Sequence, residues 1–124
     1  MHKLLEPIHM KKSWGHDITW SLTNHYMSKT IEIDAFKISD LMVYERKEKS
    51  IIVVQGILIL AMGPCCSEDD LVYTECPEGW SFYIPPGQMH RYGATDKPVR
   101  IIEVSSPELD EGIIIPDFMG IKGV

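Results

Sequence analysis

The stretch Gly79–Tyr92, with the sequence GWSFYIPPGQMHRY, reads as two short strands joined by a rigid turn. Its two consecutive prolines have a fixed φ and no backbone N–H, so the first strand must end before them. Gly87 then provides the backbone freedom that a chain reversal needs. In the strand that follows, alternation places His90 and Tyr92 on one face. The turn therefore predicts an imidazole that is held in a defined place, as a binding site requires.

The rest of the chain repeats the pattern of short strands and turns. Runs of β-branched and aromatic residues alternate with turn residues, and no helical period is visible. The predicted strands are Trp14–Trp20, Tyr26–Asp34, Ala35–Glu45, Ser50–Val54, Ile57–Met62, Leu71–Cys76, Ser81–Ile84, His90–Ala94 and Val99–Ser105. Such a series is typical of an all-β sandwich or barrel. The charged run Arg46–Lys49 reads as a solvated corner between two of these strands.

The length of 124 residues, without internal repeats or a linker, predicts one domain with its own core. Residues 1–12 are expected to form an arm or a short edge strand. Residues 106–124 are expected to form a tail that packs on the domain or on a partner subunit. The run Ile113–Ile115 and Phe118 would be unfavourable in water, which favours a homodimer.

Charge and hydropathy exclude several classes of partner. The net charge is −6 and the basic residues are scattered, which argues against nucleic acid or an anionic membrane surface. The most apolar window, Ile51–Met62, is too short to span a bilayer. The first residues do not resemble a signal peptide, so a cytoplasmic location is expected. The three cysteines Cys65, Cys66 and Cys76 have no CxxC spacing and are expected to be reduced thiols rather than zinc ligands.

Gly79, Pro85, Gly87 and His90 follow the spacing G-x5-P-x-G-x2-H, which resembles the second signature of the cupin superfamily. This resemblance implies a single-domain cupin, a jelly-roll β-barrel with a site inside. Further segments are similar, in order, to the mannose-6-phosphate isomerase-like cupins: Ser13–Gly15, Lys29–Ile31, His90–Arg91, Ile101–Ser105, Leu109–Glu111 and Asp117–Gly120. In that family such a domain binds a metal ion and a sugar phosphate. The tail motif of the family ends in Arg, whereas Ile121 and Lys122 stand here, so the isomerase activity transfers poorly.

The first cupin signature departs from the family pattern. With Gly56 as the anchor of the register, Lys49 falls at the position of the usual glutamate, and Tyr44 and Met42 fall at two ligand positions. Among the four ligand positions only His90 keeps a usual ligand type. A lysine repels a divalent cation, and neither a thioether nor a protonated phenol replaces the lost donors. We therefore expect a degenerate metal site, with no tightly bound metal and no cofactor.

A polar cluster remains inside the predicted barrel. The candidate catalytic residues are His90, Tyr44 and Tyr92. The candidate ligand-binding residues are Lys49, Arg46, Met42, Lys29 and Glu103. Some of these residues have simpler interpretations. Lys29 and Glu103 could pair with each other, Lys49 could be a solvated corner residue, and His90 could be a structural remnant.

Three hypotheses of function follow. The first is a small-molecule-binding cupin without a metal, for a sugar or sugar-phosphate-like ligand attracted by Lys49 and Arg46. The second is a metal-independent sugar isomerase or epimerase, with His90 as base and Tyr44 or Tyr92 as acid. The third is a non-enzymatic dimeric scaffold. The first and third are compatible, and together they outweigh the second.

Overall fold

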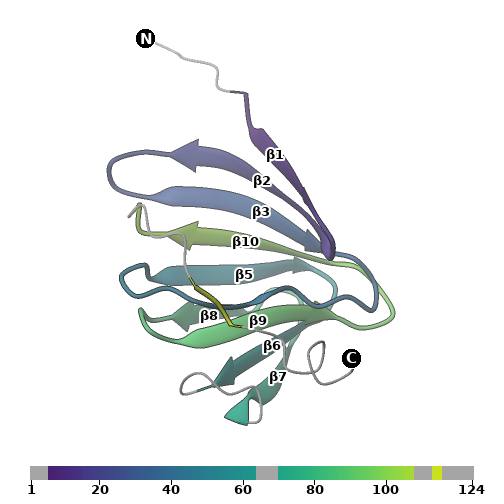
Figure 1. Cartoon of the computed structure of the whole chain (residues 1–124). Coiled ribbons are helices and arrows are strands. Elements are labelled where there is room, and N and C mark those ends of the chain that lie inside the picture. The colour runs from purple at the N-terminus through teal and green to yellow at the C-terminus, as the bar shows by residue number, and fades with distance from the viewer. Residues whose placement is uncertain (1–5, 64–69, 108–112, 116–124) are drawn as a thin grey trace.

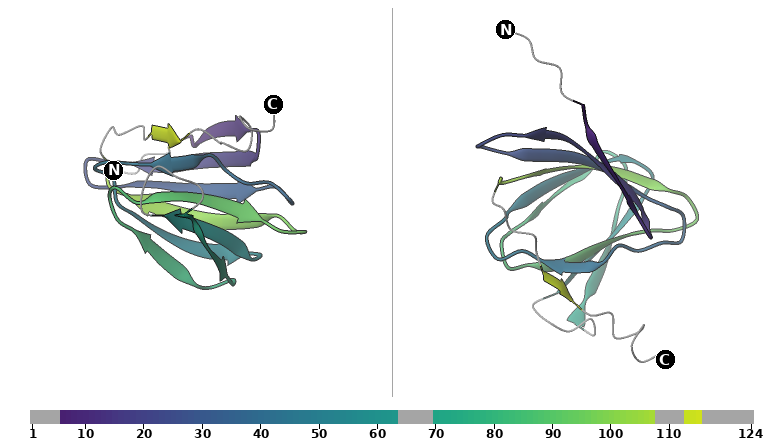
Figure 2. Two further views of the ribbon diagram at one scale, coloured as in Figure 1. Left: turned by 60° about the horizontal axis from the view of Figure 1, so that its bottom comes forward. Right: turned by 45° about the horizontal axis from the view of Figure 1, so that its top comes forward.

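The described residues form an all-β fold of two antiparallel sheets, which confirms the fold class expected from sequence (Figure 1). The computed structural model describes residues 6–63, 70–107 and 113–115. Within these ranges no helix is long and apolar enough to cross a membrane. The two sheets curve around a common interior (Figure 2).

Both sheets are built from strands that lie far apart in the sequence. The six-stranded sheet has the order β1 (Ile8–Lys12), β2 (Gly15–Leu22), β3 (Met27–Ile33), β10 (Val99–Ser105), β5 (Lys49–Gln55) and β8 (Ser81–Ile84). The five-stranded sheet has the order β11 (Ile113–Ile115), β4 (Leu41–Val43), β9 (Met89–Ala94), β6 (Leu58–Gly63) and β7 (Val72–Cys76). The chain thus crosses from one sheet to the other several times, and the inward-facing side chains of both sheets fill the interior.

Eight of the nine predicted strands are confirmed to within two residues at each end. The prediction for Ala35–Glu45 is wrong over most of its length, since only Leu41–Val43 is a strand. The chain turns before it, where the backbone N–H of Lys37 donates to the carbonyl of Asp34 at 3.1 Å. Phe36 lies in the left-handed region with φ 62°, which is incompatible with a continuous strand.

The N-terminal segment forms an edge strand where its residues are described. β1 pairs antiparallel with β2, from Ile8 opposite Thr19 to Lys12 opposite Gly15. At the other end of the chain, β11 pairs with β4 through the backbone. Most of the predicted tail, including Phe118, lies outside the described residues.

The interior has an apolar end and a polar end. The inward positions of β3 are Lys29, Ile31 and Ile33, so the pattern changes from charged to apolar along one strand. The inward positions of the antiparallel strands β5 and β10 show the same change, with Lys49 and Glu103 at the polar end. The apolar end forms one core cluster of isoleucine, valine and leucine side chains, each of which contributes about 1.5–3 kcal/mol when fully buried. Trp14, Ile31 and Tyr92 belong to this cluster and also line the pocket at the polar end, so the two ends meet at these side chains.

Cys76 belongs to the apolar end. It is a free, buried thiol, and burial raises its pKa to about 11. Such a thiol is unreactive near neutral pH. Cys65 and Cys66 lie outside the described residues.

The turn before β9 has the geometry that its sequence predicts. Gly87 has φ 80°, a left-handed conformation that glycine adopts at no steric cost. Its backbone N–H donates to the carbonyl of Tyr44 at 2.7 Å. This hydrogen bond fixes the turn against the segment after β4. The turn therefore places His90 close to Tyr44, whose ring centroid lies 6.2 Å from the centroid of the imidazole.

Candidate functional site

A pocket of about 100 Å³ occupies the polar end of the interior. Seven of the residues predicted from sequence line it: Lys29, Met42, Tyr44, Lys49, His90, Tyr92 and Glu103. Arg46 does not line it, because its side chain is exposed in the loop after β4. The pocket runs from a buried floor, formed by His90 and Glu103, to the exposed Asp40.

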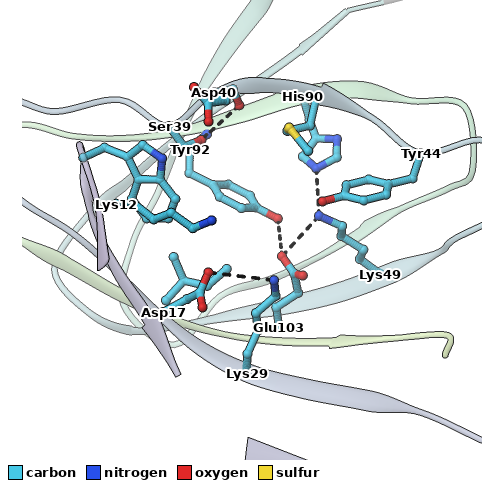
Figure 3. A pocket seen from close by; sticks show the side chains of 13 residues that line it. Lys12, Asp17, Lys29, Ser39, Asp40, Tyr44, Lys49, His90, Tyr92 and Glu103 are labelled. Atoms are coloured by element: carbon cyan, nitrogen blue, oxygen red, sulfur yellow. Dashed lines mark hydrogen bonds and ion pairs between the residues drawn. The ribbon is translucent and has the colours of Figure 1, made fainter. Parts of the chain in front are cut away.

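Lys49 lies at the centre of the floor. Its side chain is only 5% exposed, so the expectation of a solvated corner is wrong for this residue. Its Nζ lies 3.3 Å from Glu103 Oε2 and 3.2 Å from His90 Nε2 (Figure 3). It also lies 4.2 Å from the centroid of the Tyr44 ring, a distance typical of a cation–π contact. β5 begins at Lys49, and strand alternation turns this first side chain inward like that of Ile51.

His90 is a neutral imidazole whose tautomer follows from its partners. Its Nδ1 lies 2.9 Å from the carbonyl oxygen of Gln88, which can only accept, so Nδ1 carries the proton. The lone pair of Nε2 therefore faces the pocket and accepts a hydrogen bond from the Lys49 ammonium. Burial and the charge of Lys49 lower the pKa of His90 to about 4. At neutral pH this histidine is an acceptor and not a cation.

Glu103 binds two donors through one oxygen. Oε2 accepts from the Tyr92 hydroxyl at 2.8 Å and from Lys49 at 3.3 Å. Burial alone would raise the pKa of Glu103, but the charges of Lys49 and Lys29 and the Tyr92 hydroxyl together lower it. The carboxylate is therefore ionised and forms a buried ion pair with Lys49.

The ion pair considered from sequence, Lys29 with Glu103, is replaced by two others. Glu103 pairs with Lys49, and Lys29 Nζ lies 4.0 Å from Asp17 Oδ2. Lys29 lies opposite Glu103 across the β3–β10 ladder, but its ammonium is within ion-pair distance of Asp17, which reaches inward from β2 on the other side of β3. Lys29 still contributes a positive charge near Glu103.

Burial affects the other two titratable groups of the floor in opposite ways. It lowers the pKa of the Lys49 ammonium, an effect that Glu103 partly opposes. It raises the pKa of Tyr92 well above 10, and the charge of Glu103 adds to this effect. Tyr92 therefore stays protonated and serves as a hydrogen-bond donor.

Acid is expected to destabilise the protein through His90. The folded pKa of about 4 lies below the ordinary value of 6.5, so between these pH values only the unfolded chain binds the proton. The free energy of unfolding should fall by roughly 3 kcal/mol as the pH falls through this window. Below the window, His90 should cause no further change. Urea denaturation at several pH values measures it. His90→Gln should lose most of this pH dependence, whereas His25→Gln, in an exposed turn, should keep it. A full pH dependence in His90→Gln would contradict the assignment.

Several pocket residues were not predicted from sequence. These are Lys12, Trp14, Asp17, Ile31, Ser39 and Asp40. Asp17 had a usable signal, because it alternates in phase with Gly15 in a predicted strand and is buried. Ser39 had none, since it lies in the irregular segment that was predicted as a strand. Its Oγ accepts a hydrogen bond from the backbone N–H of Tyr92 at 2.9 Å.

Comparison with known proteins shows the fold. No family model and no curated protein matches the sequence, but solved structures are similar. KdgF from Halomonas sp. is 20% identical with a TM-score of 0.65, over 77% of this chain and 81% of that one. A mutant of Bacillus subtilis oxalate decarboxylase OxdC is 13% identical with a TM-score of 0.75, over 96% of this chain and 35% of that one. CapF with a bound inhibitor is 13% identical with a TM-score of 0.73, over 86% of this chain and 32% of that one. This chain therefore has the cupin β-barrel fold, and it spans about a third of the length of the last two proteins.

The cupin fold implies a metal ion in this pocket, but the residues present do not fit one. The donors on the floor are His90 Nε2 and the Glu103 carboxylate, and the Lys49 ammonium lies within 3.3 Å of both. A metal at hydrogen-bonding distance from these atoms would meet this positive charge at close range. Within the described ranges no group of three or more His, Cys, Asp or Glu side chains is arranged to hold a metal ion. The donor set favours an ammonium at this place.

Proposed function

We propose that this protein binds a small polar molecule, a sugar or sugar-phosphate-like ligand, in the barrel pocket and does so without a metal ion. The observation that carries the proposal is the buried network of Lys49, Glu103, Tyr92 and His90 on the floor of an accessible pocket. Polar groups are costly to bury, and a fold of this size has enough apolar residues to fill its interior without them. A ligand that uses these groups gives a reason for their burial.

The chemistry of the walls favours a ligand with several hydroxyl groups. The pocket alternates cations with carboxylates, so a hydroxyl group can donate to one side and accept from the other. Asp17 and Asp40 are acceptors for ligand hydroxyls, and Ser39 supplies a hydroxyl of its own. Trp14, which is 9% exposed, lends an apolar ring surface to the same pocket. Polar groups on several sides together with an aromatic ring surface suit a sugar.

Lys12 favours an acidic group on such a ligand. Its half-buried side chain reaches the pocket from β1, on the side opposite Tyr44 (Figure 3). Within the described ranges Lys12 has no ion-pair partner, whereas Lys29 and Lys49 each have one. A phosphate or carboxylate at the mouth would supply the missing countercharge. Arg46, which was expected to help in this role, is exposed elsewhere.

The metal-independent isomerase hypothesis has weaker support. His90 and Tyr92 do lie close together, with ring centroids 5.6 Å apart. An imidazole with a pKa of about 4 is a weak base, and its Nε2 already accepts from Lys49. The Tyr92 hydroxyl donates to Glu103, and its raised pKa makes it a weak acid. The pair is therefore poorly matched to acid–base catalysis near neutral pH.

The dimeric scaffold stays a prediction. The backbone of Ile113–Ile115 pairs with β4 in the same chain, from Ile113 opposite Val43 to Ile115 opposite Leu41. The side chains of this run lie outside what the structure describes. A homodimer is compatible with ligand binding, because it does not compete for the interior of the barrel.

Sugars and sugar phosphates that fit the pocket are expected to raise the melting temperature. A ligand at a hundredfold excess over its Kd should add about 3 kcal/mol of stability. A thermal-shift panel of small sugars, their phosphates and the matching sugar acids measures this effect. If Lys12 binds the acidic group, Lys12→Met should weaken the binding of sugar phosphates and leave the binding of neutral sugars unchanged. Lys97→Met, at an exposed hairpin, is the matched control and should change neither. A panel without any stabilising compound would contradict the proposal.

Trp14 offers a direct signal for the same experiment. It is the only tryptophan that lines the pocket, whereas Trp20 and Trp80 are 45% and 65% exposed. In a Trp20→Phe/Trp80→Phe background the fluorescence reports Trp14 alone. A binding curve from this signal should agree with the Kd that the thermal shift implies.

A further inference from the structure

We propose that Lys49 reacts covalently with its ligand and forms an imine with the carbonyl group of a small aldehyde or ketone, such as an open-chain sugar. This inference rests on the proposed function, because it assigns a substrate class to the same pocket. It adds a covalent reaction to the proposed binding, and it gives Lys49 a role beyond that of a fixed countercharge.

The first argument is the position of the amine. Lys49 Nζ stands on the floor of the pocket, and Figure 3 shows it pointing toward the space between His90, Tyr92 and Glu103. Its side chain is 5% exposed and is held between Glu103 and the Tyr44 ring. A small molecule that reaches the floor of this pocket lies beside this nitrogen. Confinement of this kind brings the reacting atoms together before the reaction starts.

The second argument is a proton acceptor beside the amine. An ammonium must lose a proton before it attacks a carbonyl carbon, and Glu103 Oε2 lies 3.3 Å from Nζ. His90 Nε2, 3.2 Å away, accepts a hydrogen bond from the same nitrogen and helps to hold it in place. Desolvation also lowers the pKa of Lys49, which makes the neutral amine easier to form.

With these groups the reaction balances without a further reactant. Glu103 takes one proton from the ammonium, and the nitrogen lone pair forms a C–N bond while the carbonyl π bond breaks toward oxygen. The second proton then moves from nitrogen to that oxygen, which gives a carbinolamine. Glu103 returns its proton to the hydroxyl group, the C–O bond breaks, and water leaves. The product is a protonated imine, and no oxidant or reductant is used.

The third argument is that the product suits the site. The protonated imine keeps the single positive charge of Lys49, so the ion pair with Glu103 survives the reaction. The Tyr92 hydroxyl, 2.8 Å from the same carboxylate oxygen, stays in place as a donor. The buried charges are therefore equal before and after the reaction. A neutral or doubly charged product would have lost this balance.

Reductive trapping tests the inference on the full, native chain. The protein is incubated near neutral pH with glyceraldehyde and sodium cyanoborohydride, which converts an imine to a stable amine, and modified lysines are located by peptide mapping. Lys49 should be labelled about tenfold faster than Lys37 and Lys97, which are exposed and serve as internal references. Labelling of Lys49 at the rate of the references or below overturns the inference, because a merely structural buried lysine reacts more slowly than an exposed one.

Two further measurements separate this inference from the proposed function. Glycerol, which has no carbonyl group, and a sugar that stabilises the protein should both slow the labelling of Lys49 if they occupy the pocket. The fast phase of total labelling should be absent in Lys49→Met and present in Lys97→Met. If Lys49→Met fails to fold, the mapping of the native chain decides alone. Stabilising sugars together with an unlabelled Lys49 would overturn the imine and leave the binding function intact, whereas the absence of both would overturn both.

Discussion

Replacing Lys49 by Met is expected to lower the free energy of unfolding by about 3–5 kcal/mol, because it leaves Glu103 ionised and buried without its partner. The carboxylate would keep the Tyr92 hydroxyl as a donor, but a single neutral donor does not balance a buried charge. Urea denaturation of the two proteins measures the difference. Methionine is close to lysine in length and flexibility, so the change removes the charge with little change in packing.

A double-mutant cycle separates the ion pair from packing. Lys49→Met/Glu103→Gln should recover most of the stability that Lys49→Met loses, since both buried charges are then absent. The exposed Lys37→Met should change stability by less than about 0.5 kcal/mol. If Lys49→Met costs no more than this control, the network on the floor does not hold a coupled ion pair.

Replacing Lys49 by Glu is expected to create a divalent-metal site. The ammonium that lies within 3.3 Å of His90 Nε2 and Glu103 Oε2 would be exchanged for a third N or O donor. Without metal the variant should be strongly destabilised, because two carboxylates then share a buried space. Zn²⁺ or Ni²⁺ at a hundredfold excess over its Kd should return about 3 kcal/mol, a rise of roughly 10 °C in Tm. Thermal shift and elemental analysis of the dialysed protein measure it.

Two comparisons make the metal experiment specific. The natural chain should show no shift with the same ions, because Lys49 repels them. Lys49→Glu/His90→Gln should lose the response, because the imidazole lone pair is removed while the added carboxylate remains. A stoichiometric ion in the natural chain, bound through His90, would show that the ammonium does not exclude metals.

The strands could be predicted because their signals are local. Prolines, glycines and alternating β-branched residues mark where each strand begins and ends, as the turn around Gly87 illustrates. The prediction of a strand over Ala35–Glu45 was wrong because the alternation of its residues continues through a segment whose backbone turns at Phe36. The side chain of Ile38, which alternation placed in a strand, is 53% exposed. Nothing within those few residues reveals that the backbone has to bend around the end of the barrel, which is a tertiary constraint.

The site was predictable only in part, because the ion-pair partners lie on different strands. Strand phase places Lys29, Glu103 and His90 inside, the resemblance to the first cupin signature adds Lys49, and the pocket contains all four. Which carboxylate pairs with which lysine depends on register, and the sequence does not show it. Asp17 competes for Lys29 from a neighbouring strand, which leaves Glu103 for Lys49. Lys12 reaches the pocket only because β1 folds back along β2.

The position of β1 also determines how easily the pocket can be reached. Among the described strands β1 pairs only with β2, yet it supplies Lys12 to the wall. Fraying of this outermost strand breaks a single ladder and leaves the core cluster intact, so it requires much less free energy than global unfolding. Under the proposed function, this fraying would open the Lys12 side of the pocket to ligand exchange while the floor around Lys49 keeps its shape. Because Lys12 lies on the same strand, both the exchange rate and the affinity for an acidic ligand would then depend on β1.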